Sequence, residues 1–142
     1  MIVYLDTSAL VKRYVAEPGS ALVRDAVRRR QVAVSRIAYA ELAAAVARLH
    51  REGLLGEEVR DRVLGRLDAD FAGMTVVEVR ASLVRRVPEL VKRRALRGYD
   101  AVQLAAALSL SQQGAPIDFW SGDDRLVAAA RAEELRATLV GG

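Results

Sequence analysis

The sequence predicts an α/β protein, folded as a three-layer α/β/α sandwich around a central, mainly parallel sheet of four to five short strands. Short apolar runs rich in β-forming residues alternate along the chain with longer segments of helical periodicity. These runs are apolar on both faces, which is typical of strands covered by helices on both sides. With 142 residues, 52% hydrophobic and 28% charged, the chain suits a single domain over residues 1–142.

Strands and helices alternate through the first half of the chain. The opening run is apolar, and Thr7 or Ser8 can cap the helix that follows it. Pro18 and Gly19 mark a turn, after which Ser20 can start a second helix. A long alanine-rich helix follows the second strand. The expected elements are strand 2–5, a helix from Ala9 through Tyr14, helix 21–29, strand 32–34 and helix 37–52.

Glycine and proline mark the element boundaries in the second half. Gly53 and Gly56 end the long helix, Gly73 ends the next one, and Gly98 precedes another. Pro88 is expected to disturb the helix that contains it. The expected elements are helix 57–71, strand 75–79, helix 80–96, helix 99–112, strand 117–120, helix 123–132 and a final edge strand 137–140.

The composition excludes several kinds of site. Cysteine is absent and His50 is the one histidine, so thiolate or histidine-rich metal sites, disulfides and thiol nucleophiles are excluded. The first ten residues lack a basic leader, and no apolar run approaches the roughly 20 residues that span a bilayer. We therefore expect a cytoplasmic protein without a membrane segment.

Four carboxylates occupy positions where a charge needs compensation: Asp6, Glu41, Asp100 and Asp123. Asp6 directly follows the first strand, and Asp123 follows the strand 117–120 through Ser121 and Gly122. Glu41 has only apolar neighbours one helical turn away, and Asp100 opens a strongly apolar helix. Two of these acids lie just past strand ends, where parallel α/β sheets bind ligands, and the other two lie on helices that should pack against the sheet. All four are therefore candidate site residues.

Each of these acids also has an ordinary structural explanation. Asp6 can cap a helix, Asp100 can complement a helix dipole, and Glu41 can pair with an arginine in the core. Asp118 and Asp124 lie close to Asp123, and one of the three is expected to cap the last helix.

A site built by these acids together would need a cation. Four like charges do not remain ionised in one cleft without one. Oxygen ligands without histidine or cysteine suit Mg²⁺ or Mn²⁺, and these ions chiefly serve phosphoryl-transfer chemistry.

The order of motifs resembles a PIN-domain ribonuclease, and within that superfamily a VapC-like toxin of a type II toxin–antitoxin system. The resemblance covers essentially the whole chain. It rests on four segments: Asp6-Thr7-Ser8-Ala9-Leu10, Glu41 in its alanine-rich helix, Arg97-Gly98-Tyr99-Asp100-Ala101-Val102-Gln103-Leu104-Ala105, and Ser121-Gly122-Asp123-Asp124-Arg125-Leu126. Ser121 stands where family members often have threonine, and Gly122 where they often have a bulkier residue.

The resemblance implies Mg²⁺- or Mn²⁺-dependent endonucleolytic cleavage of RNA at Asp6, Glu41, Asp100 and Asp123. Asp123 is preferred to its neighbours because Ser121 and Leu126 fit the offsets of the family motif. Asp6, Asp100 and Asp123 would hold the metal, and Glu41 would help to hold it or orient the attacking water. Ser8, which could equally cap a helix, and Ser121 would lie near the metal site.

The basic residues and the resemblance indicate partners. The segment 80–97 is rich in arginine, and Arg93, Arg94 and Arg97 are candidate contacts to RNA phosphates, with a solvated helix face as the alternative. The resemblance implies a homodimer and inhibition by a small VapB-like antitoxin. The apolar segments 35–52 and 57–71 could receive the tail of this antitoxin, with packing in the core as the alternative explanation of the same residues.

Two other classes of function remain open. The first is a binding module on the same fold that does not cleave RNA. The second is an aspartyl-phosphate enzyme or receiver domain using Asp6, although dehalogenase-like phosphatases need a second acid where Ser8 stands.

Overall fold

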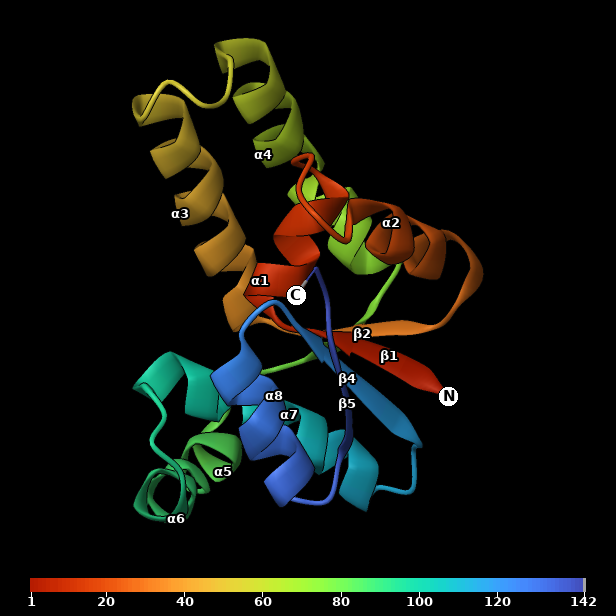
Figure 1. The fold of residues 1–142 in the computed structure, drawn as a ribbon, viewed down its shortest axis with the longest axis vertical. Coiled ribbons are helices and arrows are strands. Elements are labelled where there is room, and N and C mark those ends of the chain that lie inside the picture. Colours follow the sequence, from red (N-terminus) through yellow and green to blue (C-terminus); the bar gives the residue numbers. More distant parts are fainter. Residues whose placement is uncertain (142) are drawn as a thin grey trace.

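A computed structural model describes residues 1–141 and has the predicted three-layer α/β/α architecture (Figure 1). All neighbouring strands in the central sheet are parallel. In spatial order the sheet runs β3-β2-β1-β4-β5, so the expected C-terminal strand does lie at an edge. The strands are β1 (Ile2–Leu5), β2 (Val32–Ser35), β3 (Thr75–Val77), β4 (Ile117–Ser121) and β5 (Arg136–Leu139).

Two groups of helices cover the two faces of the sheet (Figure 1). One face packs against α1 (Thr7–Leu10), the 3₁₀ helix η1 (Val11–Arg13), α2 (Ser20–Arg29), α3 (Ile37–Arg51) and α4 (Glu57–Ala72). The other packs against α5 (Ala81–Val84), α6 (Val87–Arg93), α7 (Gly98–Gln112) and α8 (Asp124–Ala132). Because side chains alternate along a strand, Val3 and Leu5 join the first core and Tyr4 the second. None of the helices in residues 1–141 combines the length and hydropathy that a membrane crossing requires.

The strand order creates a crevice beside β1. From β1 the chain builds the sheet outward through β2 and β3, and it then returns to place β4 on the opposite side of β1. The connections from β1 and β4 therefore leave toward opposite faces of the sheet. Ligands of open α/β sheets bind at such a switch point, outside the carboxyl ends of the strands.

The expected helix 80–96 is wrong, because two short helices occupy this region. α5 ends at Val84 and α6 begins at Val87, and no helix continues from Arg94 to Leu96. Pro88 lies in the first turn of α6, where its missing N–H costs nothing. A helix running through from Val84 would instead bring the proline ring against the carbonyl one turn earlier.

The strand β3 is two residues shorter than expected. It pairs only with β2, which ends at Ser35, so beyond Val77 there is no strand left to pair with. The amide of Arg36 donates to the carbonyl of Val77 at 2.9 Å. The Arg36 side chain also forms an ion pair with Glu78, the residue after β3, at 2.6 Å.

Candidate active site

The four predicted carboxylates, Asp6, Glu41, Asp100 and Asp123, line one cavity at the switch point of the sheet. This acidic cavity has a volume of about 530 Å³. Asp6 and Asp123 come from the connections that follow β1 and β4, and Glu41 and Asp100 come from α3 and α7. The fold thus gathers side chains from segments that are far apart in the sequence.

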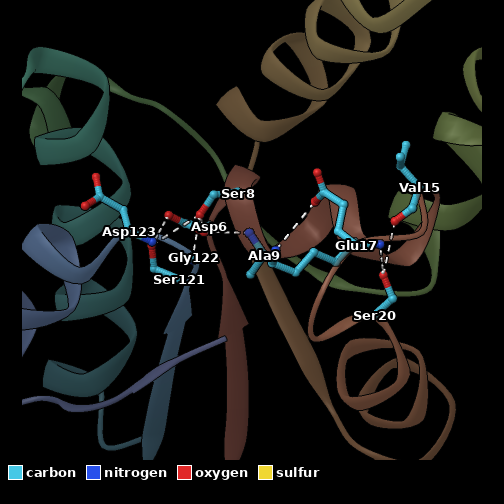
Figure 2. Close-up of polar contacts among 10 residues, drawn as sticks. Asp6, Ser8, Ala9, Val15, Glu17, Ser20, Ser121, Gly122 and Asp123 are labelled. Carbon is cyan, nitrogen blue, oxygen red and sulfur yellow. Dashed lines mark hydrogen bonds and ion pairs between the residues drawn. The ribbon is translucent and has the colours of Figure 1, made fainter. Parts of the chain in front are cut away.

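Asp6 is almost completely buried and accepts three hydrogen bonds. Its Oδ1 accepts from the Ser8 hydroxyl at 2.7 Å and the Ala9 amide at 2.9 Å, and its Oδ2 accepts from the Ser121 hydroxyl at 2.6 Å (Figure 2). Burial raises the pKa of Asp6 from 3.8 to about 6, although these hydrogen bonds oppose the shift. The bond from Ala9 makes Asp6 the cap of α1, so the expectation that Thr7 or Ser8 caps this helix is wrong.

Ser8 and Ser121 join the ends of β1 and β4 around Asp6. Besides donating to Asp6, the Ser8 hydroxyl accepts from the Gly122 amide at 2.8 Å, and the Ser121 hydroxyl accepts from the Asp123 amide at 3.0 Å. Figure 2 shows both serines gathered at Asp6 between the two strand ends. The two hydroxyls therefore orient the Asp6 carboxylate and tie the Gly122–Asp123 loop to it.

Glu41 is half-buried and held by two neutral donors. Its Oε1 accepts from the Thr7 hydroxyl at 2.7 Å and from Nε2 of Gln103 at 3.0 Å. Its alternative role, a core ion pair with an arginine, is absent from residues 1–141. The side chain lines the acidic cavity instead.

Gln103 connects Glu41 to the core of the protein. The fully buried Tyr4 hydroxyl donates to Oε1 of Gln103 at 2.7 Å, and burial raises the pKa of Tyr4 well above 10, so it remains a donor. This bond fixes the amide so that Nε2 faces Glu41 and Thr7. The sequence alone does not indicate this network of Tyr4, Thr7 and Gln103. The one available signal was a lone amide in the apolar segment 101–108.

Asp100 and Asp123 are more accessible than Asp6. The Asp100 side chain is 29% exposed and lies 3.7 Å from the guanidinium of Arg97. Burial raises the pKa of Asp100, the carboxylates of Asp123 and Glu41 raise it further, and Arg97 opposes them. Asp123 caps α8 by accepting from the Arg125 amide at 2.9 Å.

Only Asp123 of the three neighbouring aspartates lines the acidic cavity. Asp124 is exposed in the first turn of α8. Asp118 lies near the opposite end of β4, where it accepts from the Thr138 hydroxyl at 3.0 Å and pairs with Arg136 at 3.7 Å. The cap of the last helix and the cavity-facing acid are thus the same residue.

The carboxylates share a cavity, but they do not form a finished ligand set. Within residues 1–141, no three acidic or histidine side chains are placed to hold one metal ion. Both oxygens of Asp6 already accept hydrogen bonds from the protein. The all-oxygen donor set nevertheless has the chemistry that Mg²⁺ and Mn²⁺ prefer. Binding one ion through several of these acids would therefore require their side chains to rearrange.

The cations near the site fall into two groups. Arg93 and Arg94 both bind Glu133, each with a shortest distance of 2.7 Å, and so connect α6 to the end of α8. Arg48, Arg97 and the nearly buried Lys12 line the acidic cavity, and Lys12 lies 3.5 Å from Glu17. Of the three arginines predicted to contact RNA, only Arg97 therefore lies at this cavity.

Comparison with known proteins places the chain in a family. Residues 3–132 match the PIN domain. The ribonucleases VapC45 and VapC49 of Mycobacterium tuberculosis are 35% identical to it over 136 residues, covering 95% of this chain and 93% of each relative.

Solved structures agree in fold. M. tuberculosis VapC20, described as a sarcin-ricin loop cleaving toxin, aligns with a TM-score of 0.66 at 17% identity, covering 89% of this chain and 94% of its own. VapBC2 from Rickettsia felis, bound to a promoter DNA fragment, aligns with a TM-score of 0.66 at 16% identity, covering 97% of this chain and 98% of its own. The matched domain and the shared length show that this chain belongs to the PIN-domain family, as a VapC-like member.

Proposed function

We propose that this protein is a divalent-metal-dependent endoribonuclease and the toxin of a toxin–antitoxin pair. The observation that carries the proposal is the convergence of Asp6, Glu41, Asp100 and Asp123 on one cavity at the switch point of the sheet. Relatives named as ribonucleases match nearly the whole chain and support the same activity.

Three of these acids would hold Mg²⁺ or Mn²⁺: Asp6, Asp100 and Asp123. When bound, the ion supplies charge neutralisation at the phosphodiester and activation of water. Ser8 and Ser121 hold the Asp6 carboxylate in one orientation. Asp100 and Asp123 approach from the exposed side of the cavity, where RNA has access.

Glu41 would orient the attacking water. Thr7 and Gln103 both donate to Oε1, and Oε2 accepts no hydrogen bond from residues 1–141. The bonded oxygen fixes the carboxylate, and the other remains available for water. The cavity lining contains no histidine, so charge neutralisation and water activation by the ion, and not a histidine base, would carry the rate.

The geometry favours this mechanism over covalent chemistry at Asp6. A nucleophilic carboxylate needs an oxygen that can reach its substrate. Asp6 is only 4% exposed, and both of its oxygens accept hydrogen bonds.

The net charge of the chain supports RNA as the substrate, and the similar proteins support an antitoxin as a partner. The chain has a net charge of +4 although four carboxylates line one cavity, so its remaining surface is basic and suits a polyanion such as RNA. Similar folds occur in toxin–antitoxin complexes, which supports a VapB-like antitoxin as inhibitor. We further propose a cytoplasmic homodimer, with the antitoxin bound near α3 and α4.

The test is an RNA-cleavage assay with the purified protein. A mixture of transfer, ribosomal and messenger RNA is incubated with Mg²⁺, with Mn²⁺ or with EDTA, and the products are mapped by sequencing. We expect cleavage at defined sites with either metal and none with EDTA. The Asp6→Asn variant should lose at least about a hundredfold in rate, because it lacks the charge at the centre of the site.

Asp124→Asn is the matched control, because Asp124 is an exposed acid beside the site that does not line the cavity. It should cleave within about twofold of the wild-type protein. Metal-dependent RNA binding without cleavage would instead identify a binding module, and an Asp6→Asn variant with full activity would refute the role of Asp6.

A further inference from the structure

A second cavity opens beside the acidic cavity. This arginine cavity, of about 350 Å³, lies between the α6–α7 connection and the start of α8. It shares Arg97, Asp100 and Asp123 with the acidic cavity. The two cavities therefore meet at the more exposed carboxylates, and a chain leaving the acidic cavity on this side enters the arginine cavity.

The three arginines of this second cavity are held differently. Arg94 is fixed, because its guanidinium binds Glu133 at 2.7 Å and the carbonyl of Ala132 at 3.1 Å. The Arg97 side chain is 89% exposed, and its nearest anion is Asp100 at 3.7 Å. The Arg125 side chain makes no hydrogen bond or ion pair within residues 1–141. Two guanidinium groups thus remain available to an incoming anion.

The position of Arg125 is unfavourable for folding. It is the second residue of α8, and a positive charge in the first turn opposes the helix dipole. Its backbone amide contributes to the helix cap by donating to Asp123. Its side chain forms no hydrogen bond or ion pair in the described residues. An arginine that works against its own helix and borders a carboxylate cavity indicates a role in binding.

The rest of the arginine cavity offers an apolar surface. Val91, Ala95, Leu96 and Leu126 contribute to its lining, and Val91 is 41% exposed. The volume lies near the lower limit of about 300 Å³ for ligand pockets, which suits one nucleotide rather than a folded element. The arginines suit the phosphate of a nucleotide, and the apolar side chains suit its sugar or base.

Building on the proposed function, we propose that the arginine cavity binds the nucleotide next to the scissile phosphodiester of a single-stranded RNA. Arg97 and Arg125 bind its phosphates, and Val91 and Leu96 pack against its sugar or base. Because Asp100 and Asp123 border both cavities, a nucleotide held here places the adjoining phosphodiester at the carboxylates.

The test measures binding separately from cleavage. Affinity for a fluorescent single-stranded RNA is measured by anisotropy in the Asp6→Asn background with Mg²⁺, at several salt concentrations. Adding Arg125→Ala should weaken binding about tenfold, the equivalent of one lost charge-assisted hydrogen bond. The slope of log K against log salt should become shallower by about 0.7 for one lost phosphate contact. The melting temperature should stay unchanged or rise, because an unfavourable charge is removed from α8.

Arg85→Ala is the matched control. Arg85 is an exposed arginine of the same basic segment and lines neither cavity. It should change the affinity by less than about twofold. Equal losses for Arg85→Ala and Arg125→Ala would show a general charge effect and overturn the proposal.

Two further outcomes would also overturn the proposal. The first is unchanged RNA affinity in Arg125→Ala. The second is that Arg125→Ala weakens the binding of an acidic peptide but not of RNA, which would make the cavity a protein-docking site. Failure of the proposed function would appear elsewhere, as absence of metal-dependent cleavage by the wild-type protein.

Discussion

The two sides of the acidic cavity are built differently. On the β1 side, Asp6 and Glu41 accept four hydrogen bonds from side chains and one from the backbone amide of Ala9, and Asp6 is almost fully buried. On the α7–α8 side, Asp100 and Asp123 are more exposed, and Arg97 and Arg125 extend without tight partners. The carboxylates of one site thus occupy a buried, hydrogen-bonded wall on one side and a more exposed entrance on the other.

The contrast suggests a division of work. A rigid wall places its carboxylates before any ligand arrives, which reduces the reorganisation needed for chemistry. Under the proposed function, the more exposed entrance is the side from which RNA would reach the carboxylates. The wall buries the charge of Asp6, so removing that charge should raise stability while it lowers activity.

Asp6→Asn should have the strongest effect, because it should stabilise the metal-free protein while abolishing cleavage. The change in the pKa of Asp6 from 3.8 to about 6 corresponds to a cost of about 3 kcal/mol for ionising it in the fold. Asparagine removes that charge and caps a helix as well as aspartate does. Urea unfolding in EDTA at pH 8 should show this gain, reduced by any weakening of the serine hydrogen bonds.

The pH dependence gives the sign of this effect. The folded protein holds the Asp6 proton more tightly than the unfolded chain, so its stability contribution is complete below pH 3.8 and is lost as the pH rises through about 6. The advantage of Asp6→Asn should therefore be small near pH 4 and full at pH 8. An advantage that does not vary with pH would show that burial of the charge is not its cause.

An intermediate effect is expected for Gln103→Leu, which removes the donor that fixes Glu41. Cleavage should fall about tenfold to a hundredfold, as it does when a group orienting a catalytic ligand is lost. The free energy of unfolding should fall by about 1–3 kcal/mol, because Tyr4 loses the partner of its buried hydroxyl. Initial rates and urea unfolding measure the two effects.

Two variants separate positioning from general destabilisation. Tyr4→Phe keeps Gln103 but frees its amide to rotate, so it should lower the rate by less than Gln103→Leu does. Gln113→Leu, at the exposed end of the same helix, should leave the rate unchanged. Equal rates in Gln103→Leu and wild type would mean that Thr7 alone positions Glu41.

The smallest effect on cleavage is expected for the ion pairs of Glu133 with Arg93 and Arg94, which connect α6 to the end of α8. Glu133→Gln should lower the free energy of unfolding by about 1 kcal/mol and leave the cleavage rate within about twofold. Urea unfolding and the cleavage assay measure the two quantities. The neighbouring Glu134→Gln, which removes an exposed acid without an ion pair in residues 1–141, is the control. A large loss of cleavage in Glu133→Gln would show that these arginines act on RNA after all.

The fold was largely predictable because its signals are local. Apolar runs set the strands, and glycines together with Pro88 set most boundaries. The break between α5 and α6 was underestimated, because a proline disturbs a helix in several ways and only the packing of both halves selects one. The position of Asp6 as both cap and cavity acid was missed, because these roles were treated as alternatives.

Hydrophobic periodicity and charges at unfavourable positions are visible in short windows, so the fold class, the approximate strand positions and the four candidate acids could be read from the sequence alone. Only the tertiary structure decided which groups hold those acids and which cations remain available. Gln103 reaches Glu41 from 62 positions away, and Glu133 occupies Arg93 from 40 positions away. Such partners are chosen by the three-dimensional path of the chain, which no short window of sequence contains.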